Sequence, residues 1–464
     1  MASITTSNVT SAFIDLATFD EIEKYLYGGP DATAYFVRET RKSTWFSQVP
    51  VALSKASGQP AFGQEWAVSI SRAGDYLLQT WLRCQLPSVT LLDNNKFGEN
   101  GRIRWTKNFM HNIIRECNIT FNDLVAARFD NYHLDFWAAF TVPAGKRNGY
   151  NNMIGNVPPL YLPHAPGDAN AIPGTTLNLP LPFFYSRDTG VALPTAALPY
   201  NEMRINFSFR DWTDLLILED IDADSTVDQR ANISVPGDIA LAPTLGQTQV
   251  WGNYAIVSND ERKRMACAPR DVLIEQVQTA PRQTYAPQTN PQPSYDIRFS
   301  HAIKVLFFSV RNKTWKSEWS NYMTASPVTT SDTTNFTPPG SADPVLQTTL
   351  VYENTSRLSS MGSDYFSLVN PWYNAPVIPT DTGFHMYSYS LDFICLDPMG
   401  STNYGKLTNV SIVPEASNAA ITAANGNGVE GSGASFNQTY EFVVTAVNNN
   451  IIRISGGALG FPVL

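Results

Sequence analysis

The stretch from 182 to 209 constrains the fold most, because it ends in a strict two-residue alternation. Over its last seven residues every odd position is apolar and every even position is polar. A strand with one buried and one solvated face has this period, so the stretch predicts a strand at the surface of a β-sheet core. The side chains expected to line that core are Met203, Ile205, Phe207 and Phe209.

The order of features in this stretch returns about one domain length later. Pro182-Phe183-Phe184 and then Asp188-Thr189-Gly190 precede the first alternation. Pro371-Trp372-Tyr373, which lies 189 positions after the first motif, and then Asp381-Thr382-Gly383 precede a second alternation that ends at Phe393. The repeated order predicts two copies of one β fold, with the loops at 188–190 and 381–383 as structural counterparts.

A second pair of motifs supports the same duplication. Phe109, His111 and Ile113 are spaced like Phe299, His301 and Ile303, at an offset of 190 residues. Each triplet is followed by an asparagine at the same distance, Asn122 in one copy and Asn312 in the other. One tandem duplication explains both offsets.

The composition agrees with a β protein of two domains. Only 16% of the 464 residues are charged, whereas 12% are aromatic and the chain holds 31 prolines and 28 glycines. This mixture is typical of short strands joined by long ordered loops, and it suits a protein that buries its surface in an assembly. We expect an N-terminal arm with one short helix at 1–35, a first β domain at 36–268 and a second at 269–464.

Local signals place further elements along the chain. Thr18 and Glu21 have the spacing of a capping box and predict the start of the arm helix, which Gly28-Gly29 ends. Asn122 and Ser258 are each expected to cap a further helix. Strands are predicted at 76–82, 117–121, 250–257, 272–277, 299–311, 348–352, 386–393, 407–413, 439–446 and 450–454.

Charge and cysteine usage limit the partners and the compartment. A net charge of −9 is poorly suited to holding phosphates, so the short basic runs at 38–42 and 262–264 read as solvated or inter-subunit charge. The N-terminus lacks a signal-peptide pattern, and no uncharged apolar run approaches the ~18 residues of a membrane span. We expect a soluble protein made in the cytosol, without direct contact to nucleic acid. Its scattered cysteines fit a reducing compartment; they are Cys84, Cys117, Cys267 and Cys395.

The best metal candidate is an acidic loop that begins at Asp220. Asp220, Asp222 and Asp224 have the spacing of the first three ligands of a calcium loop. Ser225 stands where such a loop needs glycine, and Ala231 stands where it needs a bidentate glutamate. A solvated acidic loop is therefore favoured over a calcium site.

Other candidate sites are also weak. His111 and His301 lack the spacing of a metal-binding cupin, so each is expected to be a structural histidine in a strand. No G-x-S-x-G or Walker motif is present, and the glycine-rich segment 426–431 lacks the lysine of a phosphate loop. Glycoside cleavage needs two carboxylates across a cleft, and the sequence does not place any together. The carboxylates considered for this role are Glu65, Asp75, Glu202 and Asp211. We expect no catalytic, cofactor-binding or metal site.

Several longer segments resemble the major capsid proteins of iridoviruses, which belong to the nucleocytoplasmic large DNA viruses. They occur in the same order over nearly the whole chain, at 13–18, 101–108, 110–113, 152–156, 179–205, 400–405, 450–454 and 460–462. The resemblance implies an all-β tandem double jelly roll. Such a fold has two eight-stranded antiparallel sandwiches, with short helices and long loops.

The resemblance also implies a structural function and no enzyme activity. Three chains would form a homotrimer of pseudo-hexagonal outline, and these capsomers would tile the icosahedral shell of a large DNA virus. The implied partners are neighbouring capsomers and minor capsid proteins under the shell, with an inner viral membrane nearby that the chain does not span. The implied location is the virion capsid, assembled in the host cytoplasm. The alternative is a β-sandwich carbohydrate-binding or host-attachment protein, with Trp315, Trp319 and Tyr322 as its candidate surface.

Overall fold

The computed structural model describes residues 2–220, 230–324, 343–427 and 437–462. The chain divides into two compact units, 1–45 and 46–464.

The first unit contains two helices, α1 (Ala2–Ala17) and α2 (Glu21–Leu26), where the sequence predicted one. Asp20 caps α2 and forms the capping box with Glu23, whereas the hydroxyl of Thr18 donates to the carbonyl of Asp15. The predicted Thr18–Glu21 capping box is therefore wrong.

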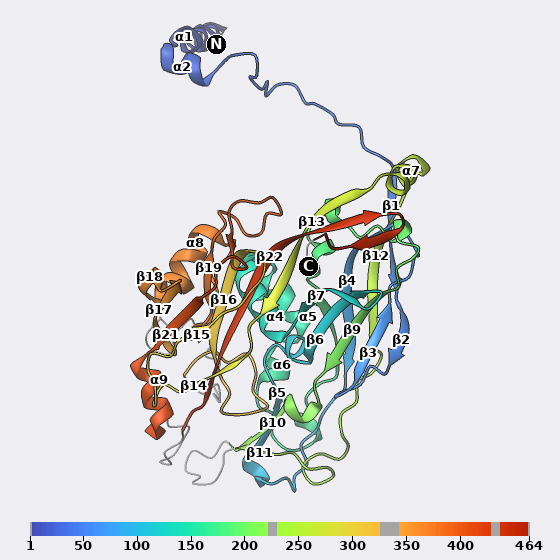
Figure 1. The fold of residues 1–464 in the computed structure, drawn as a ribbon, viewed down its shortest axis with the longest axis vertical. Coiled ribbons are helices and arrows are strands. Elements are labelled where there is room, and N and C mark those ends of the chain that lie inside the picture. The colour runs from blue at the N-terminus through green and yellow to red at the C-terminus, as the bar shows by residue number, and fades with distance from the viewer. Residues whose placement is uncertain (1, 221–229, 325–342, 428–436, 463–464) are drawn as a thin grey trace. The chain divides into compact units, whose positions relative to one another are not determined.

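Two antiparallel sheets of the second unit form a first sandwich, coloured blue to green in Figure 1 and called the first roll below. One sheet has the strand order β1-β12-β4-β8 and the other β2-β3-β9-β6-β7. Only Leu53 separates β1 from β2, so one length of chain contributes to both sheets. The strands are β1 (Phe46–Ala52), β2 (Ser54–Gly58), β3 (Glu65–Ser69), β4 (Tyr76–Leu86), β6 (Ile114–Phe121), β7 (Leu124–Phe129), β8 (Thr175–Pro180), β9 (Met203–Phe209) and β12 (Gln249–Val257).

The connections of the first roll carry a small sheet and several helices. The small sheet has the order β11-β10-β5 and consists of β5 (Gly101–Trp105), β10 (Leu216–Asp220) and β11 (Arg230–Ala231). The helices are α3 (Phe109–Asn112), α4 (Asn131–Thr141), α5 (Ala144–Ile154), α6 (Pro158–Tyr161) and α7 (Asn259–Cys267). None of the helices in the described residues is long and apolar enough to cross a membrane.

A second sandwich, coloured yellow to red in Figure 1 and called the second roll, follows from β13 onward. One sheet has the order β13-β22-β16-β19, and the other has the order β15-β21-β17-β18. The strands are β13 (Arg270–Thr279), β14 (Gln283–Tyr285), β15 (Tyr295–Asp296), β16 (Ala302–Asn312), β17 (Val345–Tyr352), β18 (Thr355–Gly362), β19 (His385–Ser388), β20 (Thr402–Asn403), β21 (Val410–Ala416), β22 (Tyr440–Ser455) and β23 (Ala458–Gly460). Its helices are α8 (Asn370–Asn374) and α9 (Asn418–Thr422).

The strand predicted from the alternation is β9, and its burial follows the predicted pattern. Met203, Ile205, Phe207 and Phe209 are each at most 2% exposed and belong to the core of the first roll. Trp66 of β3 stacks on Phe207, with ring centroids 5.4 Å apart. The prediction for this strand is confirmed, because one face of the sheet is buried and the other is polar.

The two rolls have the same topology, which confirms the tandem double jelly roll. In chain order, the strands β1, β3, β4, β6, β7, β8, β9 and β12 occupy the same places in their sheets as β13, β15, β16, β17, β18, β19, β21 and β22. β4 and β16 even share a β-bulge at the third of their eleven residues, Leu78 in one and Lys304 in the other.

The motifs that suggested the duplication are nevertheless not equivalent. The loop at 188–190 follows β8, whereas the loop at 381–383 precedes β19, which is the counterpart of β8. The counterpart of β9 is β21, so the pairing of the two alternations is wrong. His111 lies in α3 and not in a strand, and His301 lies directly before β16 with φ of 62°. The fold repeats, but these short sequence matches do not mark the repeat.

Three further element predictions are wrong in detail. Asn122 does not cap a helix: Asn122 and Asp123 form the turn between β6 and β7, with φ of 48° and 68°. Two residues with positive φ are typical of a hairpin turn whose twist matches the flanking strands. The strand predicted at 386–393 ends at Ser388, and Leu391 is 78% exposed. The strands predicted at 439–446 and 450–454 form one continuous strand, β22.

Candidate functional site

The helix α4 lies between the two rolls (Figure 1), and its aromatic side chains pack against the second roll. Phe136 stacks on Phe307 of β16, with ring centroids 5.8 Å apart and planes within 6°. Phe140 stacks on the same ring at 5.5 Å, and Phe384 meets both helix residues edge-on. Burial of each large apolar side chain contributes about 1.5–3 kcal/mol, and each aromatic pair adds about 0.5–1.5 kcal/mol. The junction between the rolls is therefore part of the core.

A buried polar network surrounds Asp135 on the same helix. The carboxylate of Asp135 accepts hydrogen bonds from the hydroxyls of Tyr322 and Ser320, at 2.8 and 2.9 Å. Nδ1 of His111 lies 2.8 Å from the other carboxylate oxygen, and Nε2 lies 2.6 Å from the hydroxyl of Tyr150. Both ring nitrogens of His111 are thus engaged by protein groups that join α3, α4, α5 and the second roll.

Four alternating charges form a second buried network, which also spans both rolls. Arg104 of β5 donates to Glu219 of β10 at 2.9 Å and lies 3.6 Å from Glu318. Arg230 of β11 lies 2.5 Å from Glu318 and 3.7 Å from Glu219. Burial by itself lowers the pKa of Arg104, but the two glutamates outweigh it and raise that pKa. Burial likewise raises the pKa of Glu318, and the two arginines outweigh it, so its pKa is lowered.

A third network uses the bulge residue of β16. Nζ of Lys304, which is fully buried, lies 2.5 Å from Glu275 of β13. Arg187 of the first roll reaches the other oxygen of the same carboxylate at 3.0 Å. The guanidinium of Arg187 also lies 3.7 Å from the ring centre of Trp137, where a cation is attracted to the aromatic face. The stretch after Pro182 therefore helps to fix one roll against the other.

The outer face of the first roll carries an apolar row that lies only partly buried. Trp251 of β12 and Pro180 of β8 stand directly opposite Trp81 of β4, one on each side. The two tryptophans are half-buried and Pro180 is exposed. Beside this row is an open groove of about 690 Å³, lined mainly by apolar side chains of α4, α5 and the segment 180–187, and by Gln79.

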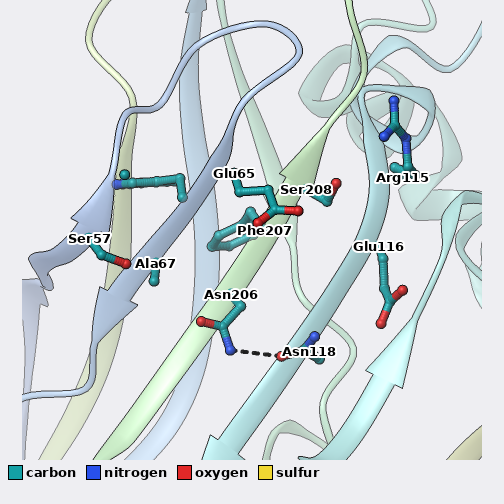
Figure 2. Close-up of a pocket in the computed structure, with 11 residues that line it drawn as sticks. Ser57, Glu65, Ala67, Arg115, Glu116, Asn118, Asn206, Phe207 and Ser208 are labelled. Carbon is teal, nitrogen blue, oxygen red and sulfur yellow. Dashed lines mark hydrogen bonds between the residues drawn. The ribbon is translucent and has the colours of Figure 1, made fainter.

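The outer face of the other sheet of the first roll is polar. A trough of about 610 Å³ lies over β2, β3, β9 and β6. Figure 2 shows residues that line it, among them Glu65, Glu116, Asn118, Asn206 and Ser208. The amide of Asn206 donates to Asn118 on the neighbouring strand at 2.8 Å. Asn206 and Ser208 belong to the polar half of the alternation, and Asn206 pairs with Asn118 as a cross-strand neighbour.

The structure does not gather the carboxylates considered for glycoside cleavage. Glu65 and Asp211 are exposed near one end of β9, whereas Glu202 precedes the other end, about 20 Å away by strand length. Asp75 is buried and binds the guanidinium of Arg262 at 2.9 Å. Most of the acidic loop after Asp220, including Asp222, Asp224, Ser225 and Asp228, lies outside the described residues. Within the described residues, no group of three or more metal-ligating side chains is present.

Two of the three aromatic residues considered for carbohydrate binding are buried, whereas Trp315 is partly buried. Trp319 is 8% exposed and Tyr322 is 1% exposed. The guanidiniums of Arg210 and Arg311 lie 3.7 and 3.6 Å from the ring centre of Trp319. Its indole N–H donates to the carbonyl of Asp214 at 2.8 Å. Trp319 and Tyr322 therefore join the two rolls and do not offer a surface to glycans.

The sequence reasoning did not find these networks or the apolar row. Their members come from distant strands and helices, and each is an ordinary residue in its local segment. A charged residue in an otherwise apolar strand, such as Lys304 within 302–310, was the one local signal. Such a residue is buried only when it is paired.

Family comparisons agree with the fold. Residues 34–257 match a family described as major capsid protein N-terminus, and residues 261–460 match a family described as large eukaryotic DNA virus major capsid protein. The major capsid protein of Costelytra zealandica iridescent virus is 68% identical over 463 residues, covering 100% of both chains. That of Invertebrate iridescent virus 6 is 68% identical over 467 residues, with the same coverage.

A solved structure shows the same fold at low sequence identity. The chain described as "PBCV-1 virus capsid, quasi-atomic model" superposes with a TM-score of 0.71 and 19% identity, over 93% of this chain and 100% of that one. The 68% identity to the iridescent virus proteins over the whole chain shows the family, whereas a shared fold at 19% identity shows the fold alone. The chain belongs to the major capsid protein family of the large eukaryotic DNA viruses, and it is a structural subunit of the virion capsid and not an enzyme.

Proposed function

We propose that three copies of this chain associate into a homotrimeric capsomer of pseudo-hexagonal outline. The observation that carries the proposal is the identical strand order of the two rolls. Three chains with two equivalent rolls present six similar units around one axis. A closed three-fold ring needs only one kind of contact between copies, and a six-sided outline tiles a flat facet.

The mass of the purified protein tests this proposal. Light scattering after size-exclusion chromatography is expected to give three times the 51.3 kDa chain mass. Electron microscopy of concentrated samples is expected to show hexagonal arrays. A stable monomer at micromolar concentration, together with a lack of arrays, would contradict the capsomer proposal.

We infer further partners from the surface of the N-terminal arm. In that unit the exposed apolar side chains include Phe13, Leu16, Phe19, Ile22 and Leu26. An apolar surface of this kind marks a protein contact. We propose that the arm, assigned to residues 1–35, contacts neighbouring capsomers or minor capsid proteins under the shell.

The remaining parts of the proposal concern the domain bounds, the surroundings of the shell and the compartment of assembly. The rolls are assigned to 36–268 and 269–464, and the shell they form is proposed to lie near an inner viral membrane without spanning it. The net charge of −9 supports a capsid layer without direct contact to nucleic acid. Free cysteines support assembly in the host cytoplasm. We propose that the subunit works without a catalytic site, cofactor or metal.

A further inference from the structure

The shared bulge gives a residue-by-residue correspondence between β4 and β16. Both strands have eleven residues and a bulge at the third, so equivalent positions are 226 residues apart. Leu77 and Ile303, which both face the core of their own roll, correspond in this way. The same offset makes Trp81 the counterpart of Phe307. Both side chains lie on the outer face of their sheet.

In the second roll, this outer position is covered from within the same chain. Phe307 stands opposite Thr445 on one neighbouring strand and Met386 on the other, and all three are buried. The covering side chains are Phe136 and Phe140 of α4. That helix lies in the connection between β7 and β8 of the first roll.

In the first roll, the equivalent position is not fully covered. Trp81 stands between Trp251 and Pro180, just as Phe307 stands between Thr445 and Met386. The two tryptophans are half-buried, Pro180 is exposed, and the groove of about 690 Å³ begins at Gln79 and Pro180. The row is thus an apolar surface with space beside it for a further side chain.

The helix α8 is the counterpart of α4 in the second roll, and its aromatic side chains are exposed. α8 lies between β18 and β19, which correspond to the β7 and β8 that flank α4. Trp372 and Tyr373 of α8 are 70% and 76% exposed, and the preceding Val369 is 42% exposed. Adjacent exposed aromatic residues of this kind are typical of a protein interface.

We propose that α8 of one copy packs on the row Trp251–Trp81–Pro180 of the next copy and places Trp372 and Tyr373 in the adjoining groove. This inference rests on the proposed trimer, and it specifies the contact that closes it. Three such head-to-tail contacts complete a ring. Each roll then covers the outer sheet face of the next roll around the ring. Within a chain the covering helix is α4, which precedes β8, and between chains it is α8, which precedes β19.

Two variants test the contact from its two sides. The helix variant replaces Trp372 and Tyr373 by arginine, which the groove disfavours because Lys146 and Arg187 line it. The groove variant is Pro180→Arg. All three replaced residues are exposed, so the fold is expected to be kept, as circular dichroism and the melting temperature would show. The matched control is Leu241→Arg, at a leucine that is 81% exposed.

The readout is the mass in solution at a concentration where the wild-type protein is a trimer. Both variants are expected to be monomers. The helix variant loses a central tryptophan, which weakens such a contact at least about thirty-fold, and the groove variant places a charge in the apolar row. The Leu241→Arg control is expected to stay trimeric. A mixture of the helix variant and the groove variant retains one intact pair of surfaces, so it is expected to form dimers and not closed trimers.

The outcomes separate this inference from the proposed function. If the folded helix variant remains a trimer, the contact through α8 is wrong and the trimer stands. If the mixture forms no dimer while both variants are folded monomers, the pairing of α8 with the groove is wrong. A wild-type protein that is itself monomeric overturns the capsomer proposal, and the contact with it.

Discussion

Phe136 of the first roll stacks almost parallel on Phe307 of the second, with the two ring planes only 6° apart. Both rings are fully buried, and they lie in the same core cluster as the strands of the first roll. The two rolls are therefore expected to unfold together, because loss of this contact exposes the core of one roll and the outer sheet face of the other.

We predict that Phe136→Ala lowers the free energy of unfolding by about 3–5 kcal/mol, because it leaves a cavity in a packed aromatic cluster. Denaturant unfolding at fixed protein concentration measures this loss. Leu391→Ala, at a side chain that is 78% exposed, is the control and should change stability by less than about 0.5 kcal/mol. A loss of less than about 1 kcal/mol for Phe136→Ala would mean that the junction contributes little to stability.

Glu318→Gln is predicted to destabilise the protein by about 3–5 kcal/mol. Glu318 is 5% exposed and pairs with Arg230 and Arg104, so its neutralisation leaves these two buried arginines with a single carboxylate, that of Glu219. Asp271→Asn removes an exposed partner of Arg453 and should shift the unfolding midpoint far less. Equal shifts for the two variants would argue against a special role of the buried network.

His133 is expected to make stability depend on pH. Burial lowers the pKa of His133 to about 3 from the usual 6.5, so the folded protein keeps the ring neutral. Below pH 6.5 the unfolded chain binds a proton that the folded chain does not bind, and stability therefore falls as pH falls from 6.5 towards 3. The loss between pH 6.5 and pH 5 is about 2 kcal/mol, at ~1.4 kcal/mol per pH unit.

The variant His133→Phe isolates this contribution from that of the carboxylates. Stability is measured for both proteins between pH 7 and pH 5, and the difference between the two curves is attributed to His133. The wild-type curve should fall more steeply by about 2 kcal/mol. Parallel curves would show that His133 takes up its proton in the folded state.

Thiol labelling is expected to divide the cysteines into two pairs. Cys84 and Cys117 are buried, and burial raises the pKa of Cys84 to about 12, so little reactive thiolate forms. Cys267 is exposed and Cys395 is partly exposed. Iodoacetamide at pH 8 should modify Cys267 first and Cys395 next, as peptide mass spectrometry would show. Labelling of Cys84 in the folded protein would contradict the packing of β4.

The sequence predicted β9 well because its alternation is local. Each residue from Met203 to Phe209 lies on the face that its own polarity indicates. The turn after β6 was missed because Asn122 and Asp123 suit both a helix start and a turn with positive φ, and only the pairing of β6 with β7 decides between them.

The two Asp-Thr-Gly tripeptides suggested equivalent loops, but the backbone requires glycine in only one of them. Gly383 has φ of 101°, and a Cβ there would lie 2.1 Å from the carbonyl oxygen of Tyr322. Gly190 has no such backbone requirement, and its nearest outside atom is a side-chain oxygen of Asp188 at 3.5 Å. The tripeptides therefore match by sequence and not by structural role.

The junction and the apolar row could not be predicted from local patterns. Trp81 and Phe307 become comparable only when the pairing of β4 and β16 with their neighbours is known, since the bulge sets the face of every following residue. The buried charges likewise become pairs only in the folded chain, as Arg104 and Glu318 are contributed by different rolls.

The bulge in β4 and β16 has a consequence for how a duplicated chain can diverge. A bulge residue stands outside the alternation, so its replacement alters neither the core face nor the outer face of the strand. One copy holds Leu78 at this position, and the other holds Lys304, whose ammonium binds Glu275. The two copies can thus hold an apolar residue and a charged residue at this position while both sheets keep the same register. The lysine of the second roll thereby holds Glu275, the carboxylate to which Arg187 of the first roll binds, so the difference between the copies helps to join them.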